Sequence, residues 1–180
     1  MPAPSPDEAF ASFEREIGLL ETAGRTGAPT QDPDSGFFGL PHDEFVTLLR
    51  DLRDEIEQRA YLVIVAAAEA VIQVDFRARV DGRAAVLLRD RARQLSRQER
   101  RGRRIVLEDV LDAWADLPDA RRAPISEFKQ LLNHRHWLAH GRYFVNRAAV
   151  PDDPGFAVAR ARTLLAELNR LDPTFPRNTP

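Results

Sequence analysis

The chain has 180 residues, is 43% hydrophobic and carries a formal net charge of −2, which suits one domain of ordinary size, with or without a tail. It contains no cysteine, which excludes a disulfide framework and thiolate chemistry. The acidic, proline-rich start lacks the features of a signal peptide, and the longest apolar run, residues 60–74, is too short for a membrane span and contains Glu69. We therefore expect a cytoplasmic protein with no membrane partner.

The near-neutral average conceals two regions of opposite charge. Residues 1–59 contain 13 acids and 5 arginines, whereas residues 77–104 contain 11 arginines and 3 acids. The basic region would suit a phosphate backbone, although it has no aromatic side chain that could stack on a base. An equally open interpretation is a solvated helix face that pairs with the acidic N-terminal helices.

The first part of the chain predicts two helices separated by a linker. Residues 5–24 have Ser5 and Asp7 as candidate N-caps and Gly24 as a stop signal. The next stretch, up to residue 41, is rich in glycine, proline and aspartate and predicts a linker. Residues 42–79 predict one long helix whose apolar residues surround its whole circumference after Ala60, as expected for the central helix of a bundle.

The second part of the chain predicts further helices and no strand. We expect a basic helix over residues 83–97, a loop at RQERRGRR, and a short helix ended by Pro118. A helix then begins near Pro124 or Ser126 and ends at Gly141, and a last helix covers residues 154–171. The prediction is an all-α helical bundle of five to six helices with a long central helix. We expect three divisions. Residues 1–41 form a helix and a linker that pack on the bundle, residues 42–172 form the helical domain, and residues 173–180 form a frayed tail.

Three of the four histidines fall within HRHWLAHGRYF, residues 134–144. His136 and His140 are four residues apart, which is the spacing of a two-histidine metal pair on a helix. A zinc protease needs glutamate directly after the first histidine, where this chain has Trp137, and His134 points away from the pair. A third ligand is therefore missing, and we expect neither a metal nor another cofactor.

Arg135 lies on the apolar face of its predicted helix, together with Phe128, Leu131 and Leu138. A charged side chain on that face needs a partner or a polar cavity. Glu69 is the only charged residue in the long apolar run and is the candidate partner. One interpretation is a structural ion pair that fixes the register of two helices.

Residues 135–140, RHWLAH, also resemble the signature of the HEPN superfamily, the higher eukaryotes and prokaryotes nucleotide-binding domains. That signature is arginine, a polar residue that is often asparagine, a few more residues, and histidine. Gly141 after the histidine agrees with it, as does the position of the motif late in an all-helical domain. The resemblance covers about residues 42–170, and it departs from the family where His136 replaces the common asparagine.

The resemblance implies metal-independent RNA cleavage by a homodimer whose two motifs face a shared cleft. In that chemistry His140 would act as acid or base on the 2′-hydroxyl, and Arg135 would bind the phosphate. His136 would orient the phosphate or position His140, and Glu69 would hold Arg135. Because Arg135 and His140 are about 140° apart on an ideal helix, a bend or a two-fold partner would have to bring them together.

Other basic residues are expected to contact the RNA. They are Arg142, Lys129, Arg100, Arg101, Arg103 and Arg104. The expected partners are RNA, a second copy of the chain, and an antitoxin or other defence-system protein. The alternative function is a non-catalytic HEPN-like helical domain that binds nucleic acid, a nucleotide or a partner protein.

Overall fold

The computed structural model describes residues 4–82, 88–100, 102, 104–139 and 151–175. Over these residues the protein forms α-helices, one short 3-10 helix (Ala28–Thr30) and no strand, which confirms the predicted all-α bundle of five to six helices. The helices are α1 (Pro6–Thr26), α2 (His42–Val80), α3 (Arg89–Arg100), α4 (Leu107–Ala115), α5 (Arg122–Ala139) and α6 (Pro154–Leu171). None of the described helices combines the length and the apolarity that crossing a bilayer requires.

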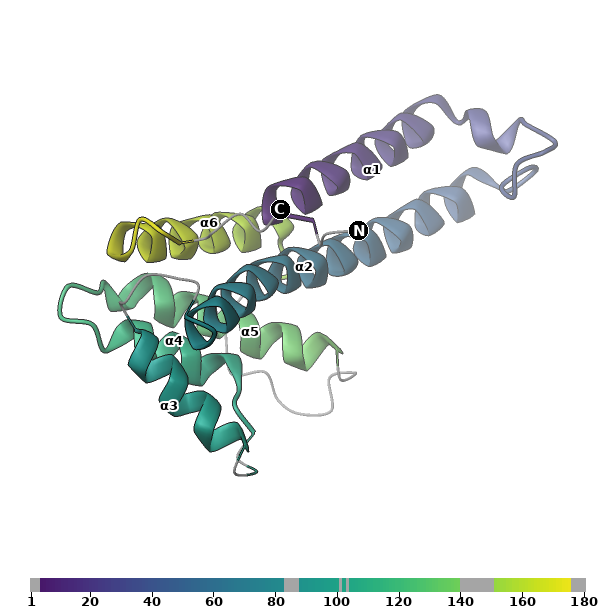
Figure 1. Cartoon of the computed structure of the whole chain (residues 1–180). Coiled ribbons are helices and arrows are strands. Elements are labelled where there is room, and N and C mark those ends of the chain that lie inside the picture. Colours follow the sequence, from purple (N-terminus) through teal and green to yellow (C-terminus); the bar gives the residue numbers. More distant parts are fainter. Residues whose placement is uncertain (1–3, 83–87, 101, 103, 140–150, 176–180) are drawn as a thin grey trace.

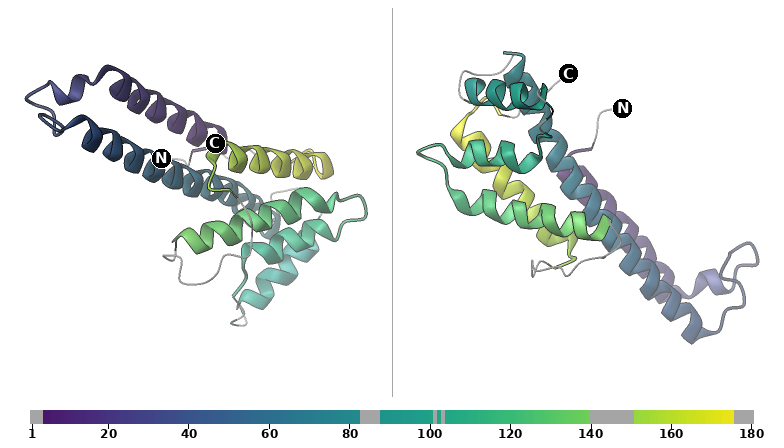
Figure 2. Two further views of the ribbon diagram at one scale, coloured as in Figure 1. Left: turned by 180° about the vertical axis from the view of Figure 1, so that it is seen from behind. Right: turned by 90° about the horizontal axis from the view of Figure 1, so that it is seen from below.

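The long helix α2 organises the whole arrangement. The helices α1 and α6 lie end to end along one side of α2, and α3, α4 and α5 pack around its second half (Figures 1 and 2). Because only α1 accompanies the first half of α2, these two helices project from the bundle as an antiparallel hairpin. The chain therefore consists of a bundle built on the second half of α2 and an arm built on the first half.

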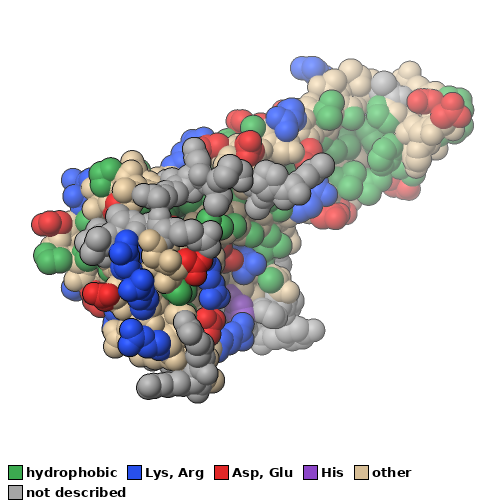
Figure 3. Space-filling view, viewed as in Figure 1, with side chains coloured by type: hydrophobic (Ala, Val, Ile, Leu, Met, Phe, Trp, Pro, Cys, Tyr) green, Lys and Arg blue, Asp and Glu red, His purple; other side chains and the backbone are tan. Residues whose placement is uncertain are grey.

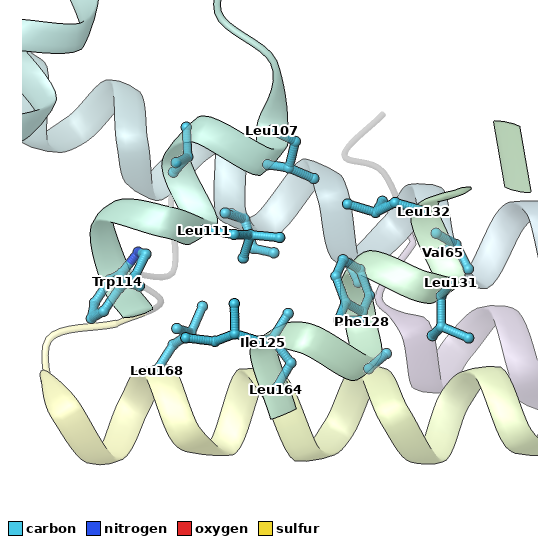
Figure 4. Close-up of a cluster of buried hydrophobic side chains, with 14 of the residues drawn as sticks. Val65, Leu107, Leu111, Trp114, Ile125, Phe128, Leu131, Leu132, Leu164 and Leu168 are labelled. Carbon is cyan, nitrogen blue, oxygen red and sulfur yellow. The ribbon is translucent and has the colours of Figure 1, made fainter. Parts of the chain in front are cut away.

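The hydrophobic core lies in the bundle and includes Ala9 at the start of α1. From Tyr61 onwards α2 is buried on several sides, and its side chains meet those of α4, α5 and α6 (Figure 4). Trp114 of α4, Phe128 of α5 and Leu164 of α6 are among the fully buried side chains of this cluster. This agrees with the apolar pattern that the sequence shows after Ala60, and it positions α5 firmly against α2.

The start of α1 follows the sequence signals, but its end does not. Ser5 and Glu8 form a capping box, in which the Glu8 N–H donates to Ser5 Oγ and the Ser5 N–H donates to Glu8 Oε2. The helix passes through Gly24 and stops at Gly27, which has a φ of 61°. The predicted stop at Gly24 is wrong, since α1 continues to Thr26; a Cβ at position 24 would lie 3.0 Å from Leu49 Cδ1 of α2.

Two other predicted helix ends also shift. The basic helix α3 continues to Arg100, so the expected loop starts later than residue 97, and residues 83–87 of the predicted helix lie outside the described residues. Helix α5 begins at Arg122, ahead of both predicted starts. Pro124 falls in its first turn, where a missing N–H breaks no helical hydrogen bond. The predicted end at Gly141 lies outside the described residues.

Residues 173–175 pack on the bundle and do not form the beginning of a frayed tail. The ring of Phe175 is 1% exposed and meets Trp114 edge to face, with the ring centroids 5.7 Å apart. Thr174 donates to Asp172 Oδ1 from both its N–H and its hydroxyl group. Burial of one aromatic side chain is enough to fix this segment, and residues 176–180 lie outside the described part of the chain.

A buried ion cluster joins the end of α2 to the end of α6. The Arg79 side chain is 2% exposed and donates from Nε and Nη2 to Asp75 (2.6 and 3.0 Å) and from Nη1 to Asp172 (2.9 Å). Its guanidinium lies over the Trp114 ring, 4.7 Å from the centroid. One arginine therefore balances two buried carboxylates and stacks on an aromatic ring, which is the geometry that suits a planar guanidinium.

Replacing Arg79 with alanine should destabilise the fold by about 3–5 kcal/mol, because two buried carboxylates would lose their only described cation. The matched change is Arg77→Ala on the same helix, where a 58% exposed side chain pairs with Glu99 and the expected loss is about 1 kcal/mol or less. Urea unfolding of the two variants measures the difference. Equal losses would contradict the importance of this cluster.

Candidate functional site

The predicted contact between Glu69 and Arg135 is present and joins α2 to α5. Arg135 Nη1 lies 3.3 Å from Glu69 Oε1, and the two side chains are 36% and 22% exposed. The guanidinium is thus at the edge of the bundle and not in its core, although the helical pattern places Arg135 on the apolar face. The contact leaves part of the arginine accessible to a ligand.

Burial shifts the pKa of the Glu69 carboxylate. It raises the pKa of Glu69, the positive charge of Arg135 opposes the shift, and the negative charge of Glu108 adds to it. A carboxylate that has lost part of its hydration interacts more strongly with a neighbouring cation than a fully exposed one does. Glu69 therefore brings a partly desolvated carboxylate into contact with Arg135.

His134 occupies the buried position beside this pair. It is 2% exposed, and its Nε2 contacts the carboxylate of Asp152, which follows α5 in the chain. Its ring packs edge to face on Tyr61, with the centroids 5.1 Å apart, and against Trp137 at 5.4 Å. These contacts tie the last turns of α5 to α2 and to the chain segment that leads into α6.

Tyr61 completes the polar part of this buried cluster. Its hydroxyl donates to the carbonyl of Leu131 at a distance of 3.4 Å, and burial together with the charge of Asp152 raises its pKa. The sequence pattern did not reveal the roles of Tyr61, His134 and Asp152. A helical wheel shows which residues of one helix share a face. His134 instead contacts Asp152, which lies 18 residues further along the chain and outside that helix.

The other predicted site residues divide into three groups. Lys129 is half-buried on α5 and contacts the exposed Asp112 of α4 at 2.5 Å, so it forms an ion pair at the surface of the bundle. His136 and Arg104 are exposed. His140, Arg142, Arg101, Arg103 and the side chain of Arg100 lie outside the described residues.

The basic helix α3 lies at the end of the bundle that is remote from α1, and Lys and Arg side chains gather over it in Figure 3. It packs on α2 and α4. The side chains of α1 make their ion pairs with Arg53, Arg59 and Arg162. Within the described residues, the expected pairing of the basic helix with α1 is therefore not seen, whereas the expected solvated face is, since Arg91, Arg93 and Arg97 are exposed.

The described residues include no group of three or more histidine, cysteine, aspartate or glutamate side chains that could hold a metal ion. This statement does not cover the pair of His136 and His140, because His140 lies outside the described residues. Comparison with protein-family models, with curated proteins and with solved structures gives no match.

The strength of the Glu69 and Arg135 contact can be measured with a double-mutant cycle. We expect a coupling energy of about 0.5–1 kcal/mol between Glu69→Ala and Arg135→Ala, because both side chains remain partly exposed to water. Urea unfolding of the two single variants and the double variant provides the value. A coupling near zero would mean that the pair does not form, and one of about 3 kcal/mol would indicate a purely structural buried pair.

Proposed function

We propose that the chain is a metal-independent endoribonuclease of HEPN type that acts as a toxin or phage-defence effector. The observation that supports it is the presentation of Arg135, which Glu69 holds on the edge of the bundle near the end of α5. His140 follows the last described residue of that helix directly. An accessible arginine followed five residues later by a histidine supplies a phosphate ligand and a proton-transfer group.

The proposed reaction is an intramolecular transesterification of RNA. The 2′-oxygen forms a bond to the adjacent phosphorus, the bond between that phosphorus and the 5′-oxygen breaks, and the products carry a 2′,3′-cyclic phosphate and a 5′-hydroxyl. A base removes the proton of the 2′-hydroxyl, and an acid donates a proton to the leaving 5′-oxygen. An imidazole, with an ordinary pKa of about 6.5, suits either role near neutral pH, and we assign it to His140.

Arg135 would stabilise the negative charge that grows on the phosphate oxygens during this reaction. Its contact with Glu69 is partly exposed, so exchange of one anionic partner for another, or sharing of the guanidinium between them, involves a small free-energy change. Glu69 is then a positioning residue, since it would act through Arg135. His136, the next residue after Arg135, is exposed and would orient the phosphate or position His140.

A homodimer would solve the geometric problem of the motif. On an ideal helix Arg135 and His140 point about 140° apart, so one straight helix would not aim both at the same phosphate. In a two-fold dimer each copy can contribute one of the two groups to a shared site. Exposed arginines such as Arg97 and Arg104 would then bind the RNA backbone in a salt-dependent way.

A second candidate function is a non-catalytic domain of the same kind that binds nucleic acid, a nucleotide or a partner protein. The observation in its favour is that two of the expected phosphate-binding cations already have carboxylate partners, Arg135 with Glu69 and Lys129 with Asp112. In this case the motif would stabilise the fold and would not cleave RNA.

An RNase assay in excess EDTA separates the two candidates. We expect the unaltered chain to cleave RNA with 2′,3′-cyclic phosphate ends, and Arg135→Ala and His140→Ala each to lower the rate by about 100-fold or more. The matched controls are Arg50→Ala and His42→Ala, which remove the same residue types from exposed positions of α2 and should retain the full rate.

The outcomes of this assay are distinct. Full activity of both motif variants would contradict the site, and activity that disappears in EDTA would contradict the metal-independent reaction. Circular dichroism and thermal unfolding of each variant accompany the assay. An unaltered chain that does not cleave RNA, together with an Arg135→Ala variant that unfolds, would favour the non-catalytic candidate.

A further inference from the structure

The N-terminal arm, defined as α1 together with residues 42–59 of α2, buries few of its apolar side chains. Among residues 42–59, all of which the structure describes, only Phe45 is buried, and Ile17 is the one buried side chain of α1 beyond Ala9. Of the other large apolar side chains of the arm, Leu19 and Val46 are exposed, and Phe10 packs on the core of the bundle. The rest are half-buried, namely Phe13, Leu20, Leu48, Leu49, Leu52 and Ile56. Two helices cover one side of each other, so this apolar stripe lacks a third element.

A groove runs along the inner part of the arm. It has a volume of about 350 Å³, and its lining combines apolar side chains, among them Phe13, Ile56 and the 41% exposed Val63, with charged ones. The charged lining is Glu8, Arg15 and the Glu16–Arg59 ion pair, so it carries both signs and no excess of positive charge. Leu52 and Leu48 continue the stripe outwards from Ile56 at intervals of four residues. Figure 3 shows hydrophobic side chains gathered on the visible face of the outer arm, where no other helix covers them.

The borders of the stripe are negatively charged. Glu44, Asp51 and Glu55 are exposed and lie at intervals of seven and four residues, so they share one face of α2 with Leu48. Residues 1–59 contain 13 acids and only 5 arginines. Two of these arginines, Arg53 and Arg59, already form ion pairs with glutamates of the arm.

The charge decides between the possible occupants. A second copy of the arm offers an apolar stripe, but it would bring a second acidic surface against the first, which is unfavourable. The basic helix α3 of a second copy has the right charge, but its apolar residues Ala92 and Leu95 are buried in its own bundle. The remaining occupant is a helix that has both an apolar stripe and basic borders.

We propose that the N-terminal arm is a docking site for a basic amphipathic helix of a partner protein. Leucine-sized side chains at positions i, i+3, i+4 and i+7 of that helix pack on the stripe, and its lysines and arginines face the acidic borders. The 18 residues from 42 to 59 span about 27 Å, which is the length of a partner helix of the same size. This site is separate from the proposed RNase site and does not depend on RNA cleavage.

The test uses a fluorescent synthetic helix of 18 residues that has a leucine stripe and lysine elsewhere, titrated with the whole chain. We expect saturable binding that weakens as salt is added. One control peptide keeps the leucines and replaces lysine with glutamate, and a second keeps the lysines and replaces leucine with serine. Neither control peptide should bind, because the site requires the apolar stripe and the basic charge together.

Two arm variants localise the binding. Leu48→Ser and Asp51→Lys should each weaken it by about fivefold or more, which corresponds to about 1 kcal/mol. The matched controls Val106→Ser and Asp116→Lys change exposed residues of the same kinds at the other end of the molecule and should leave binding unchanged. If Leu48→Ser fails to fold, Asp51→Lys, which alters an exposed charge, still decides the question.

Three results would overturn the proposal: no binding of the basic peptide, equal binding of the acidic peptide, or binding that neither arm variant affects. Light scattering examines the competing occupant. Self-association that Leu48→Ser abolishes would assign the arm to a second copy of the chain. The dimer proposed for RNA cleavage should persist in Leu48→Ser, so a failure of one proposal is distinguishable from a failure of the other.

Discussion

The arrangement of the structure depends on α2 being longer than the hydrophobic core that surrounds it. This helix is continuous over 39 residues, but the core surrounds only its second half. The second half supplies core side chains, Arg79 and Asp75 of the buried ion cluster, and Glu69, which contacts Arg135 of α5. Among the described helices, only α1 packs along the first half (Figure 1), where Phe37 of the connecting segment also contacts Phe45. Because α2 runs without a break through the arm and the bundle, one continuous helix connects the arm to the candidate site.

The candidate site is a compromise between burial and access. Glu69 is buried enough that its pKa is raised, and Arg135 is exposed enough to meet a ligand. A fully buried pair, such as Arg79 with Asp75, has no free face and can serve only the fold. Behind the exposed pair, His134 fixes the last turns of α5 through Tyr61 and Asp152. This division gives a rigid support to a group that remains accessible.

The sequence predicted the features that depend on one helix or on a single pair of unusual residues. The bounds of α2 and α6, and the contact of Glu69 with Arg135, follow from periodicity and from a charge on an apolar face. Features that depend on contacts between distant segments were missed. The close approach of Gly24 to Leu49, the Arg79 cluster and the burial of Phe175, which joins the C-terminal segment to the bundle, are examples. The roles assigned to His140 and its neighbours remain predictions.

The central claim is that one active site combines Arg135 of one copy with His140 of the other. Mixing equal amounts of the inactive variants Arg135→Ala and His140→Ala tests it most directly. Random exchange of subunits makes half of the dimers mixed, and each mixed dimer has one intact site, so about a quarter of the original RNase activity should return. If the mixture stays as inactive as its components although mixed dimers form, the claim is contradicted.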